Sequence, residues 1–571
     1  MKDYSEWTAV LDYEHDSEWV NPNRPWLKLR GPEVPKSLHF DPIPLHEYLK
    51  IAVRKCPNNV CIYHKPSDKK YTYREVGHYA DKIANALHEL GVGKGDAVAI
   101  MSANCPEFVF CYLGVLETGA IIVPINPLLT ESDVSHIVRE SGNVKLIFVH
   151  KTNYRTIKKT RKKIEVPHVV LIASDTAKED TITLDEFIED KAAKIPDVDI
   201  DPINDIAALL FTGGTTGLPK GVMLTHNNLV SNALQIVCGL FNSIEEAEET
   251  RGKTVNLSIL PLCHAMGFTV LNIVFNGGDM LVMFESFDPA KVLEGIEYYK
   301  VETFVAVPVM HQMIINHPDF TERDLSSIET VTSGSAALAP ELNKRFEEVV
   351  GIKVGQGYGL TEVTCASHGN PIWLPEIIPE SIGVPIINTD SIIVNPDTLE
   401  ELPLGEVGEI LTRGPQVMKG YWKSPEATKK DLVNGWLRTG DLGRIDENGY
   451  FYIEGRTKDM VKYKGYKVMA KEVEEKLMEH LAILEAGVVG VPDPNIGETI
   501  KAFIVLKKDY RDKGITDRDI IEWSKERMAG YKYPRQVEFI KALPRTAVGK
   551  IFRKKLREME IEKKEKPIAP L

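Results

Sequence analysis

The sequence predicts an α/β protein with a large N-terminal domain of doubly wound sheets, residues 1–457, and a small mobile C-terminal α/β domain, residues 458–571. Three observations support this prediction. The length of 571 residues exceeds what a single hydrophobic core fills. From Leu45 onward, short apolar runs alternate with helical patterns, the order that builds a largely parallel sheet with helices on both faces. Near Gly455–Lys458 the composition changes to a compact, charged α/β segment.

The predicted elements of the large domain alternate in type along the chain. The first 45 residues are rich in Trp, Pro and charge and are expected to wrap a surface. Asp96–Met101 is predicted as a buried strand, and Cys105–Glu117 as the helix that follows it. Further strands are expected at Ala120–Pro124, Val144–Val149, Val169–Ala173 and Ala207–Phe211.

The small domain is predicted after a hairpin strand at Tyr450–Glu454. Lys471–Leu481 and Thr516–Met528 have the periodicity of amphipathic helices. Strands are expected at Ala486–Val491 and Lys501–Leu506.

Bulk properties exclude several classes of protein. A formal charge of −13 argues against a surface that binds nucleic acid, and the basic run Lys151–Lys163 is interpreted as a solvated helix face or loop. The seven cysteines contain no Cys-x-x-Cys pair, which is typical of reduced thiols in a cytoplasmic protein. The N-terminus lacks an apolar signal segment.

One uncharged stretch, Leu257–Gly278, is apolar enough to suggest a membrane span. It contains Pro261, His264, Asn272 and Asn276, whose polar groups a lipid-facing helix would have to satisfy internally. A buried strand, a loop and a core helix fit this stretch better, so no transmembrane segment is predicted.

A Gly- and Thr-rich segment, Thr212–Gly221, follows the apolar strand that ends at Phe211. Glycines let backbone N–H groups approach a phosphate, threonine hydroxyls add donors, and a lysine adds positive charge. The segment is not a Walker A loop, because Leu218 and Pro219 interrupt the Gly-Lys-Ser/Thr order. The candidate phosphate-binding residues are Thr212, Gly213, Gly214, Thr215, Thr216, Gly217 and Lys220.

This segment resembles the signature loop of the adenylate-forming superfamily, which includes acyl-CoA synthetases, luciferases and the adenylation domains of peptide synthetases. The resemblance extends in the expected order from about Leu45 to Arg557. It implies that family's fold, with ATP, Mg²⁺ and coenzyme A as cofactors. It also implies activation of a carboxylic acid as an acyl-adenylate, followed by transfer of the acyl group to coenzyme A.

Two further segments resemble the family's adenine-binding and phosphate-binding elements. Ser333–Ala337 is similar to the turn that lines adenine, and Gln356–Glu362 to the most diagnostic nucleotide segment. The resemblance implies that Tyr358 stacks on adenine, Thr361 bonds the α-phosphate and Glu362 holds Mg²⁺. An aromatic face suits a base, and a hard carboxylate suits a hard cation. The other nucleotide-binding candidates here are Gly334, Ser335, Ala336, Gln356, Gly357 and Gly359.

The resemblance also assigns residues around the junction of the two domains. Asp441 would accept hydrogen bonds from both ribose hydroxyls, and Arg456 would reach the same ribose. Lys458 occupies the hinge position. Lys550, in the segment Pro544–Arg553, matches the catalytic lysine that would bridge the carboxylate and the α-phosphate. The candidate residues for coenzyme A are Lys464, Gly465 and Tyr466.

The acyl pocket is assigned to small or apolar residues around one histidine. His264, in Leu260–Gly267, matches the family histidine beside the acyl group, which we also count among the catalytic candidates. The other candidates are Val305, Val307, Gly355 and Val363. None of them could clamp a second carboxylate, so an apolar monocarboxylate is expected, with the resemblance favouring a medium- or long-chain fatty acid. Short-chain, hydroxy and aryl acids remain alternatives.

The family resemblance also allows other acceptors for the acyl group and a non-catalytic role. The acyl group could pass to a carrier protein, or react with oxygen as in luciferases, but no carrier domain is appended. A non-catalytic nucleotide sensor is disfavoured because Lys550, Glu362, Asp441 and Arg456 are all present. Nothing in the sequence specifies the oligomeric state, although many members of the family form homodimers.

Overall fold

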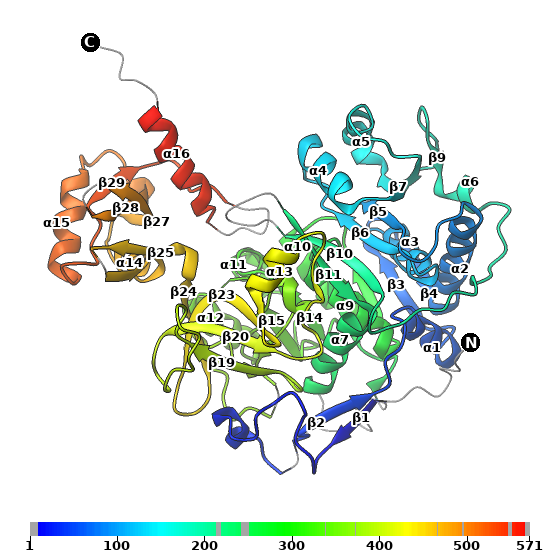
Figure 1. Cartoon of the computed structure of the whole chain (residues 1–571), viewed down its shortest axis with the longest axis horizontal. Coiled ribbons are helices and arrows are strands. Elements are labelled where there is room, and N and C mark those ends of the chain that lie inside the picture. The colour runs from blue at the N-terminus through cyan, green and yellow to red at the C-terminus, as the bar shows by residue number, and fades with distance from the viewer. Residues whose placement is uncertain are drawn as a thin grey trace.

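The computed structural model describes residues 9–32, 34–212, 219–240, 250–336, 338–371, 373–464, 466–493, 496–545 and 551–565. Over these ranges the chain forms two large, mostly parallel sheets, an antiparallel sheet, and a smaller sheet near the C-terminus. Figure 1 shows the C-terminal sheet and its helices, coloured orange to red, to the left of the larger body.

The first sheet contains the strands predicted in the first half of the chain. Its central pairs β6–β5, β5–β7 and β7–β8 are parallel, and β11 adds an antiparallel strand beyond β10. Its order is β21 (Gly420–Tyr421), β11 (Lys220–Thr225), β10 (Ile206–Thr212), β6 (Ile121–Ile125), β5 (Ala97–Met101), β7 (Val144–His150), β8 (His168–Ile172) and β9 (Ile182–Thr183).

The second sheet is also mostly parallel and ends in the antiparallel hairpin of β3 and β4. Its order is β16 (Gly355–Gln356), β15 (Thr330–Ser333), β14 (Thr303–Ala306), β12 (Val255–Ser258), β13 (Met280–Met283), β3 (Val60–His64) and β4 (Lys69–Thr72).

The two large sheets share one layer of helices. In β5, Val98 and Ile100 face that layer, while Ala97, Ala99 and Met101 face the opposite side, as the pleat of a strand requires. The shared layer contains α1 (Glu47–Lys55), α2 (Tyr73–Glu89), α3 (Pro106–Glu117), α6 (Leu184–Ile188), α7 (His226–Leu240) and α9 (Ala265–Gly277).

The outer faces of both sheets are covered as well. Helices α4 (Glu131–Ser141) and α5 (Tyr154–Thr160) pack on the first sheet. Helices α10 (Pro289–Tyr299), α11 (Pro308–Ile315) and α12 (Pro340–Val350) pack on the second. The result is the doubly wound arrangement that the alternating sequence pattern predicts.

A third, antiparallel sheet follows the two parallel ones. Its order is β19 (Asp390–Val394), β20 (Gly408–Arg413), β23 (Trp436–Ile445) and β22 (Leu432–Val433), with β24 (Phe451–Arg456) on β23 and α13 (Pro425–Asp431) between β21 and β22. Trp26, in η1 (Pro25–Leu29), is fully buried against Phe451. The N-terminal segment therefore does wrap a surface, that of the third sheet, in the connection between the paired strands β1 (Ala9–Asp12) and β2 (Ser37–Phe40).

The fourth sheet belongs to the C-terminal part of the chain. Its order is β26 (Tyr466–Met469), β25 (Met460–Tyr463), β28 (Gly497–Leu506) and β27 (Ile483–Asp493), with β29 (Gln536–Phe539) on β28. Helices α14 (Ala470–Met478) and α15 (Asp517–Arg527) pack on one face, and α16 (Arg553–Glu565) packs on the other. This sheet begins four residues after β24 ends, across the short turn η6 (Thr457–Asp459).

The predicted α/β fold class is confirmed, and most predicted elements agree with the structure to within a few residues. The third sheet, whose strands are antiparallel and one of which is only two residues long, adds to the two doubly wound sheets. The predicted strand Lys501–Leu506 is longer, because β28 begins at Gly497. The stretch from Leu257 to Gly278 forms a strand end, a loop and helix α9, as expected. Within the described residues, no helix is both long and apolar enough to span a membrane.

Candidate nucleotide and acyl site

Three candidate nucleotide residues meet at the edge of the third sheet. Asp441 of β23 lies directly opposite Arg456 of β24 in the strand register. Arg456 Nε lies 2.6 Å from Asp441 Oδ1, and the Tyr358 hydroxyl donates to Asp441 Oδ2 at 2.8 Å. The Asp441 carboxylate raises the pKa of Arg456, and burial raises the pKa of Tyr358. A buried carboxylate beside an aromatic ring and a guanidinium is a chemically suitable place for a nucleoside.

The predicted adenine turn lies beside the segment that contains Tyr358. Strands β15 and β16 pair so that Ser333 faces Gln356, and the Gly357 N–H donates to the Ser333 carbonyl at 2.9 Å. Gly334 follows this pair, Ser335 has a left-handed φ of 73°, and Ala336 is exposed. The structure therefore brings these two predicted segments together.

Gly359 occupies a position that no other residue could take without a backbone shift. A Cβ atom there would lie 1.8 Å from the carbonyl oxygen of Cys365, far inside van der Waals contact. This close approach folds the segment after Tyr358 back on itself and leads into the short helix η5 (Thr361–Val363). The turn thus sets the positions of Thr361 and Glu362 relative to Tyr358.

The Glu362 carboxylate is held by a residue that sequence reasoning missed. The Tyr421 hydroxyl donates to Glu362 Oε1 at 3.0 Å. Burial raises the pKa of Glu362, and the hydrogen bond from Tyr421 acts in the opposite direction. The positive charge of Arg456 also lowers the pKa of Glu362. A half-buried carboxylate with one engaged oxygen fits Mg²⁺, which uses few protein carboxylates and takes phosphate oxygens as further ligands.

The predicted phosphate loop joins two adjacent strand ends. β10 ends at Thr212 and β11 begins at Lys220, and these two residues face each other in the register. The Lys220 ammonium lies 4.9 Å from the centroid of the Tyr421 ring. The loop candidates Gly213, Gly214, Thr215, Thr216 and Gly217 lie outside the described residues.

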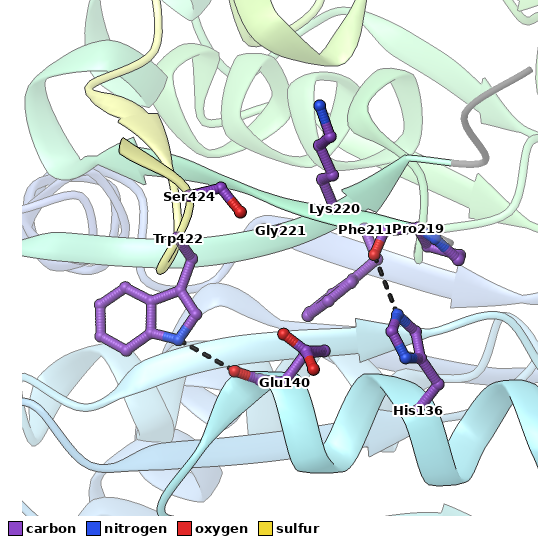
Figure 2. Close-up of a pocket in the computed structure, with 8 residues that line it drawn as sticks. All are labelled: His136, Glu140, Phe211, Pro219, Lys220, Gly221, Trp422 and Ser424. Atoms are coloured by element: carbon purple, nitrogen blue, oxygen red, sulfur yellow. Dashed lines mark hydrogen bonds between the residues drawn. The ribbon is translucent and has the colours of Figure 1, made fainter. Parts of the chain in front are cut away.

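A cavity of about 230 Å³ lies beside the end of this loop, and Figure 2 shows the residues that line it. It is lined by His136 and Glu140 of α4, Phe211 of β10, Lys220 of β11, and Trp422 and Ser424. A His136 ring nitrogen lies 3.1 Å from the carbonyl oxygen of Pro219, and the Trp422 indole donates to the Glu140 carbonyl at 3.0 Å. The Lys220 side chain points away from His136 and Glu140, so its positive charge lies on the opposite side of β11.

His264 caps the start of helix α9 without a side-chain hydrogen bond to the helix. Its Nε2 lies 3.3 Å from the Asn126 amide, and burial lowers the pKa of the imidazole. A neutral ring can accept or donate one hydrogen bond without adding charge beside a carboxylate. Asn126 was not identified from the sequence, because nothing local in its loop after β6 indicates a contact with residue 264.

The four remaining acyl-pocket candidates lie on or beside four different elements, β14, β16, α11 and η5. Val305 lies on β14 and Gly355 on β16, the two neighbours of β15. Val307 caps α11, and Val363 is completely buried in the core that contains α9. Met266 lies between the predicted acyl pocket and the predicted adenine turn. It belongs to the segment that contains His264, and a Cβ atom added at Gly334 would lie 2.4 Å from the Met266 methyl carbon.

The hinge candidate and the catalytic-lysine segment are tied together through α16. Arg557 donates to the Lys458 carbonyl at 2.9 Å and lies 3.3 Å from Asp459. Arg553 pairs with Asp459 at 3.1 Å and with the buried Glu474 at 2.6 Å. Lys550 itself lies outside the described residues.

The coenzyme A candidates lie at the hairpin between β25 and β26. Lys464 has a left-handed φ of 49°, and Tyr466 stacks on Tyr531 with ring centroids 4.4 Å apart. Gly465 lies outside the described residues. The stack gives the hairpin a rigid aromatic side and leaves Tyr466 54% exposed.

Comparison with known proteins defines the class to which this fold and site belong. The sequence pattern of the AMP-binding enzyme family matches residues 49–422, and that of the AMP-binding enzyme C-terminal domain matches residues 472–550. The chain belongs to the AMP-binding enzyme family.

Individual relatives extend over nearly the whole chain. A long-chain-fatty-acid–CoA ligase of Bacillus subtilis is 38% identical over 94% of this chain and 98% of its own length. A probable 4-coumarate–CoA ligase 1 of Dictyostelium discoideum is 34% identical over 90% and 95%. The ATP-bound structure of MatB from Rhodopseudomonas palustris has a TM-score of 0.80 at 27% identity, covering 90% of this chain and 98% of that one.

Proposed function

We propose that the protein is an ATP-dependent, AMP-forming acid–CoA ligase whose acid is a medium- or long-chain fatty acid. The observation that carries the proposal is the cluster of Tyr358, Asp441 and Arg456, in a chain similar to acid–CoA ligases over nine-tenths of its length. The long-chain-fatty-acid–CoA ligase of Bacillus subtilis is 38% identical to this chain and the probable 4-coumarate–CoA ligase 1 of Dictyostelium discoideum 34%, which favours an aliphatic acid.

The first half-reaction joins two anions, so the protein must neutralise charge and fix the line of attack. In the proposal, Asp441 and Arg456 hold the ribose, Tyr358 contacts the adenine, and Thr361 bonds the α-phosphate. The glycine-rich segment from Thr212 to Lys220 encloses the β- and γ-phosphates. Glu362 would hold Mg²⁺, which adds positive charge to the polyphosphate when bound.

Lys550 completes this arrangement in the proposal. Its ammonium would bridge the carboxylate of the acid and the α-phosphate, so that an acid oxygen attacks phosphorus and pyrophosphate leaves. The product is a mixed anhydride of the acid and AMP.

The second half-reaction needs a different group at the same place. We infer that residues 458–571 rotate about Lys458 relative to residues 1–457, withdrawing Lys550 and presenting Lys464, Gly465 and Tyr466. The thiol of coenzyme A then attacks the anhydride carbonyl and AMP leaves. Gly465 has no side chain to obstruct the pantetheine. His264, Val305, Val307, Gly355 and Val363 would surround the acyl group.

A second candidate acid is aromatic, because 4-coumarate–CoA ligases are also similar to this chain over about nine-tenths of its length. The experiment that separates the two measures acid- and CoA-dependent AMP release with saturated fatty acids of graded length, hydroxy acids and 4-coumarate. The proposal expects the highest kcat/KM for a medium- or long-chain fatty acid. A preference for 4-coumarate or a short acid would overturn the choice of acid, and no AMP release with any acid would overturn the activity.

A further inference from the structure

Tyr421 contacts both groups assigned to the phosphate end of the nucleotide. Its hydroxyl donates to Glu362 Oε1 at 3.0 Å, and its ring lies 4.9 Å from the Lys220 ammonium. The side chain is only 7% exposed, so these contacts occur in a water-poor environment. Tyr421 therefore lies between Glu362 and Lys220, which are 142 residues apart in the sequence.

The backbone around Tyr421 is held at several points. In the pairing of β21 with β11, Tyr421 faces Val222, two residues from Lys220. The Tyr421 N–H donates to the Thr428 hydroxyl at 2.9 Å, and the Met418 N–H donates to the Glu362 carbonyl at 2.9 Å. The segment 418–421 thus binds Glu362 twice, through the Met418 backbone and through the Tyr421 side chain. These contacts set the position of Tyr421 relative to Glu362 before any ligand binds.

These contacts have a definite chemical effect on each neighbour. A carboxylate has two oxygens, and the hydroxyl that binds Oε1 of Glu362 leaves Oε2 to face a cation. Hydrogen bonds of this kind orient the carboxylates that bind metal ions and tune their affinity. The face of the aromatic ring attracts the ammonium of Lys220 and restrains it near the polyphosphate.

We propose that Tyr421 is a positioning residue that aligns Glu362 for the metal and Lys220 for the phosphates of the bound nucleotide. The inference rests on the proposed function, since it takes Glu362 as the magnesium ligand. Tyr421 touches neither the acid nor the reacting phosphorus, and it acts through these two side chains.

The test uses the full-length protein and measures metal binding directly. Mn²⁺ replaces Mg²⁺, and its bound fraction is followed by electron paramagnetic resonance with α,β-methylene-ATP, which cannot form the adenylate. Tyr421→Phe keeps the ring under Lys220 and removes only the hydroxyl. It should weaken Mn²⁺ binding roughly 10- to 100-fold, the usual effect of losing a group that orients a metal ligand.

The matched control is Tyr452→Phe. Tyr452 also donates its hydroxyl to a carboxylate, Asp446 Oδ2 at 3.0 Å, but does so elsewhere on the third sheet. This variant should bind Mn²⁺ as the unmodified protein does. Unchanged binding in Tyr421→Phe overturns the role of the hydroxyl.

The failure of this inference can be told apart from failure of the proposed function. Glu362→Ala should weaken Mn²⁺ binding more than Tyr421→Phe does, and normal binding in that variant overturns the metal assignment itself. In the double variant, measured at Mn²⁺ concentrations that still give partial binding, Tyr421→Phe should add nothing further, because the carboxylate that accepts from its hydroxyl is gone. A full additional loss would mean that Tyr421 acts by another route and would overturn the inference.

The ring and the fold are tested separately. Tyr421→Leu should weaken binding of the nucleotide analogue beyond Tyr421→Phe, and equal binding by the two overturns the role of the ring. A protein with 3-fluorotyrosine at position 421 keeps the hydroxyl and the shape of the side chain. Its fluorine resonance should move when Mg²⁺ is added with the analogue, and a resonance that does not move contradicts the inference without relying on a stable Tyr421 variant.

Discussion

Arg456 and Asp441 form an ion pair directly across the β23–β24 register, with 2.6 Å between Nε and Oδ1. Both side chains are proposed to contact the ribose, so each restrains the other before the nucleotide binds. Asp441 is 5% exposed, and Tyr358 binds its second oxygen. The carboxylate is therefore pre-oriented from two sides.

Replacing Asp441 with Asn should raise the KM for ATP in acid-dependent ATP–pyrophosphate exchange. The variant keeps the shape of the side chain but loses the charge that binds Arg456 and accepts from the ribose. Loss of a hydrogen bond to a charged group costs about 1.5–3 kcal/mol, which corresponds to a KM increase of roughly ten- to a hundred-fold.

The control for Asp441→Asn is Glu454→Gln, on the same hairpin. Glu454 pairs with Arg444 at 3.0 Å, and both side chains are about one-third exposed. Its loss should leave the KM for ATP unchanged. An unchanged KM in Asp441→Asn would remove Asp441 from the nucleotide site.

Replacing Arg553 with Lys should slow adenylate formation without changing the KM for ATP. Arg553 spans Asp459 of the hinge turn and Glu474 of α14, and it lies three residues after Lys550. Lysine keeps the charge but cannot contact both carboxylates through a planar fork. A displacement of about 1 Å at a reacting group costs about 10²-fold in rate, so we expect a fall in kcat of that order.

The exposed Arg527, which contacts Glu526 beside it, provides the comparison for Arg553. Arg527→Lys should retain full activity, and thermal unfolding of both variants shows whether the fold is preserved. A folded Arg553→Lys enzyme with normal kcat would show that this arginine does not position the lysine segment.

Replacing Lys550 with Ala should abolish acid-dependent ATP–pyrophosphate exchange while thioester formation from supplied acyl-adenylate continues. The lysine is needed only where the carboxylate and the α-phosphate meet. Normal exchange in this variant refutes the catalytic role of Lys550.

The reverse pattern is expected from Gly465→Leu, which should leave exchange intact and block thioester formation. If both half-reactions survive this change, the proposed path of the pantetheine is wrong. The two variants together test whether one cleft performs two steps with different parts of the C-terminal domain.

Asp279, directly after helix α9, should make stability depend on pH. Burial raises its pKa from 3.8 to about 7, although the Gly252 N–H donates to its Oδ1 at 3.2 Å. Between these values the folded chain binds more protons than the unfolded chain, so this residue's contribution to stability is lost as pH rises through 7. The difference of about 3 pKa units sets an upper limit of about 4 kcal/mol.

The measurement compares Asp279→Asn with the unmodified protein in urea unfolding from pH 5 to pH 8. Asparagine stays neutral, so the variant should gain stability relative to the unmodified protein as pH rises, with no further change above about pH 8. Asp190→Asn, at an exposed position, is the control. A constant difference between Asp279→Asn and the unmodified protein across this range would contradict the perturbed carboxyl.

Local sequence patterns predicted the parallel part of the fold because each strand there contains its own signal. Leu146–Val149 of β7 and Val169–Ile172 of β8 are continuous apolar runs, as expected for strands buried on both faces. In the third sheet, only the hairpin strand at Tyr450–Glu454, which overlaps β24, was predicted. Strand β22 of this sheet has only two residues. The packing of the sheet depends on a contact between Trp26 and Phe451, which are 425 residues apart in the sequence.

The same distinction applies to the candidate site. Tyr358, Asp441 and Arg456 were found through resemblance to motifs, and the structure brings the three together. Tyr421 and Asn126 were missed because each acts through a contact with a distant residue, Glu362 and His264 respectively. Such contacts depend on the pairing of strands and the positions of loops, which a short sequence window does not contain.

The hairpin of β23 and β24 ends at Arg456, and only Thr457 separates that arginine from Lys458. The carbonyl of Lys458 is in turn bound by Arg557 of α16. If the C-terminal part rotates about Lys458 as proposed, a nucleotide that draws Arg456 away from Asp441 pulls on the chain two residues from that hinge. The proposed rotation would then depend on what occupies the proposed ribose position, through two neighbouring residues and without a long-range relay through the sheets.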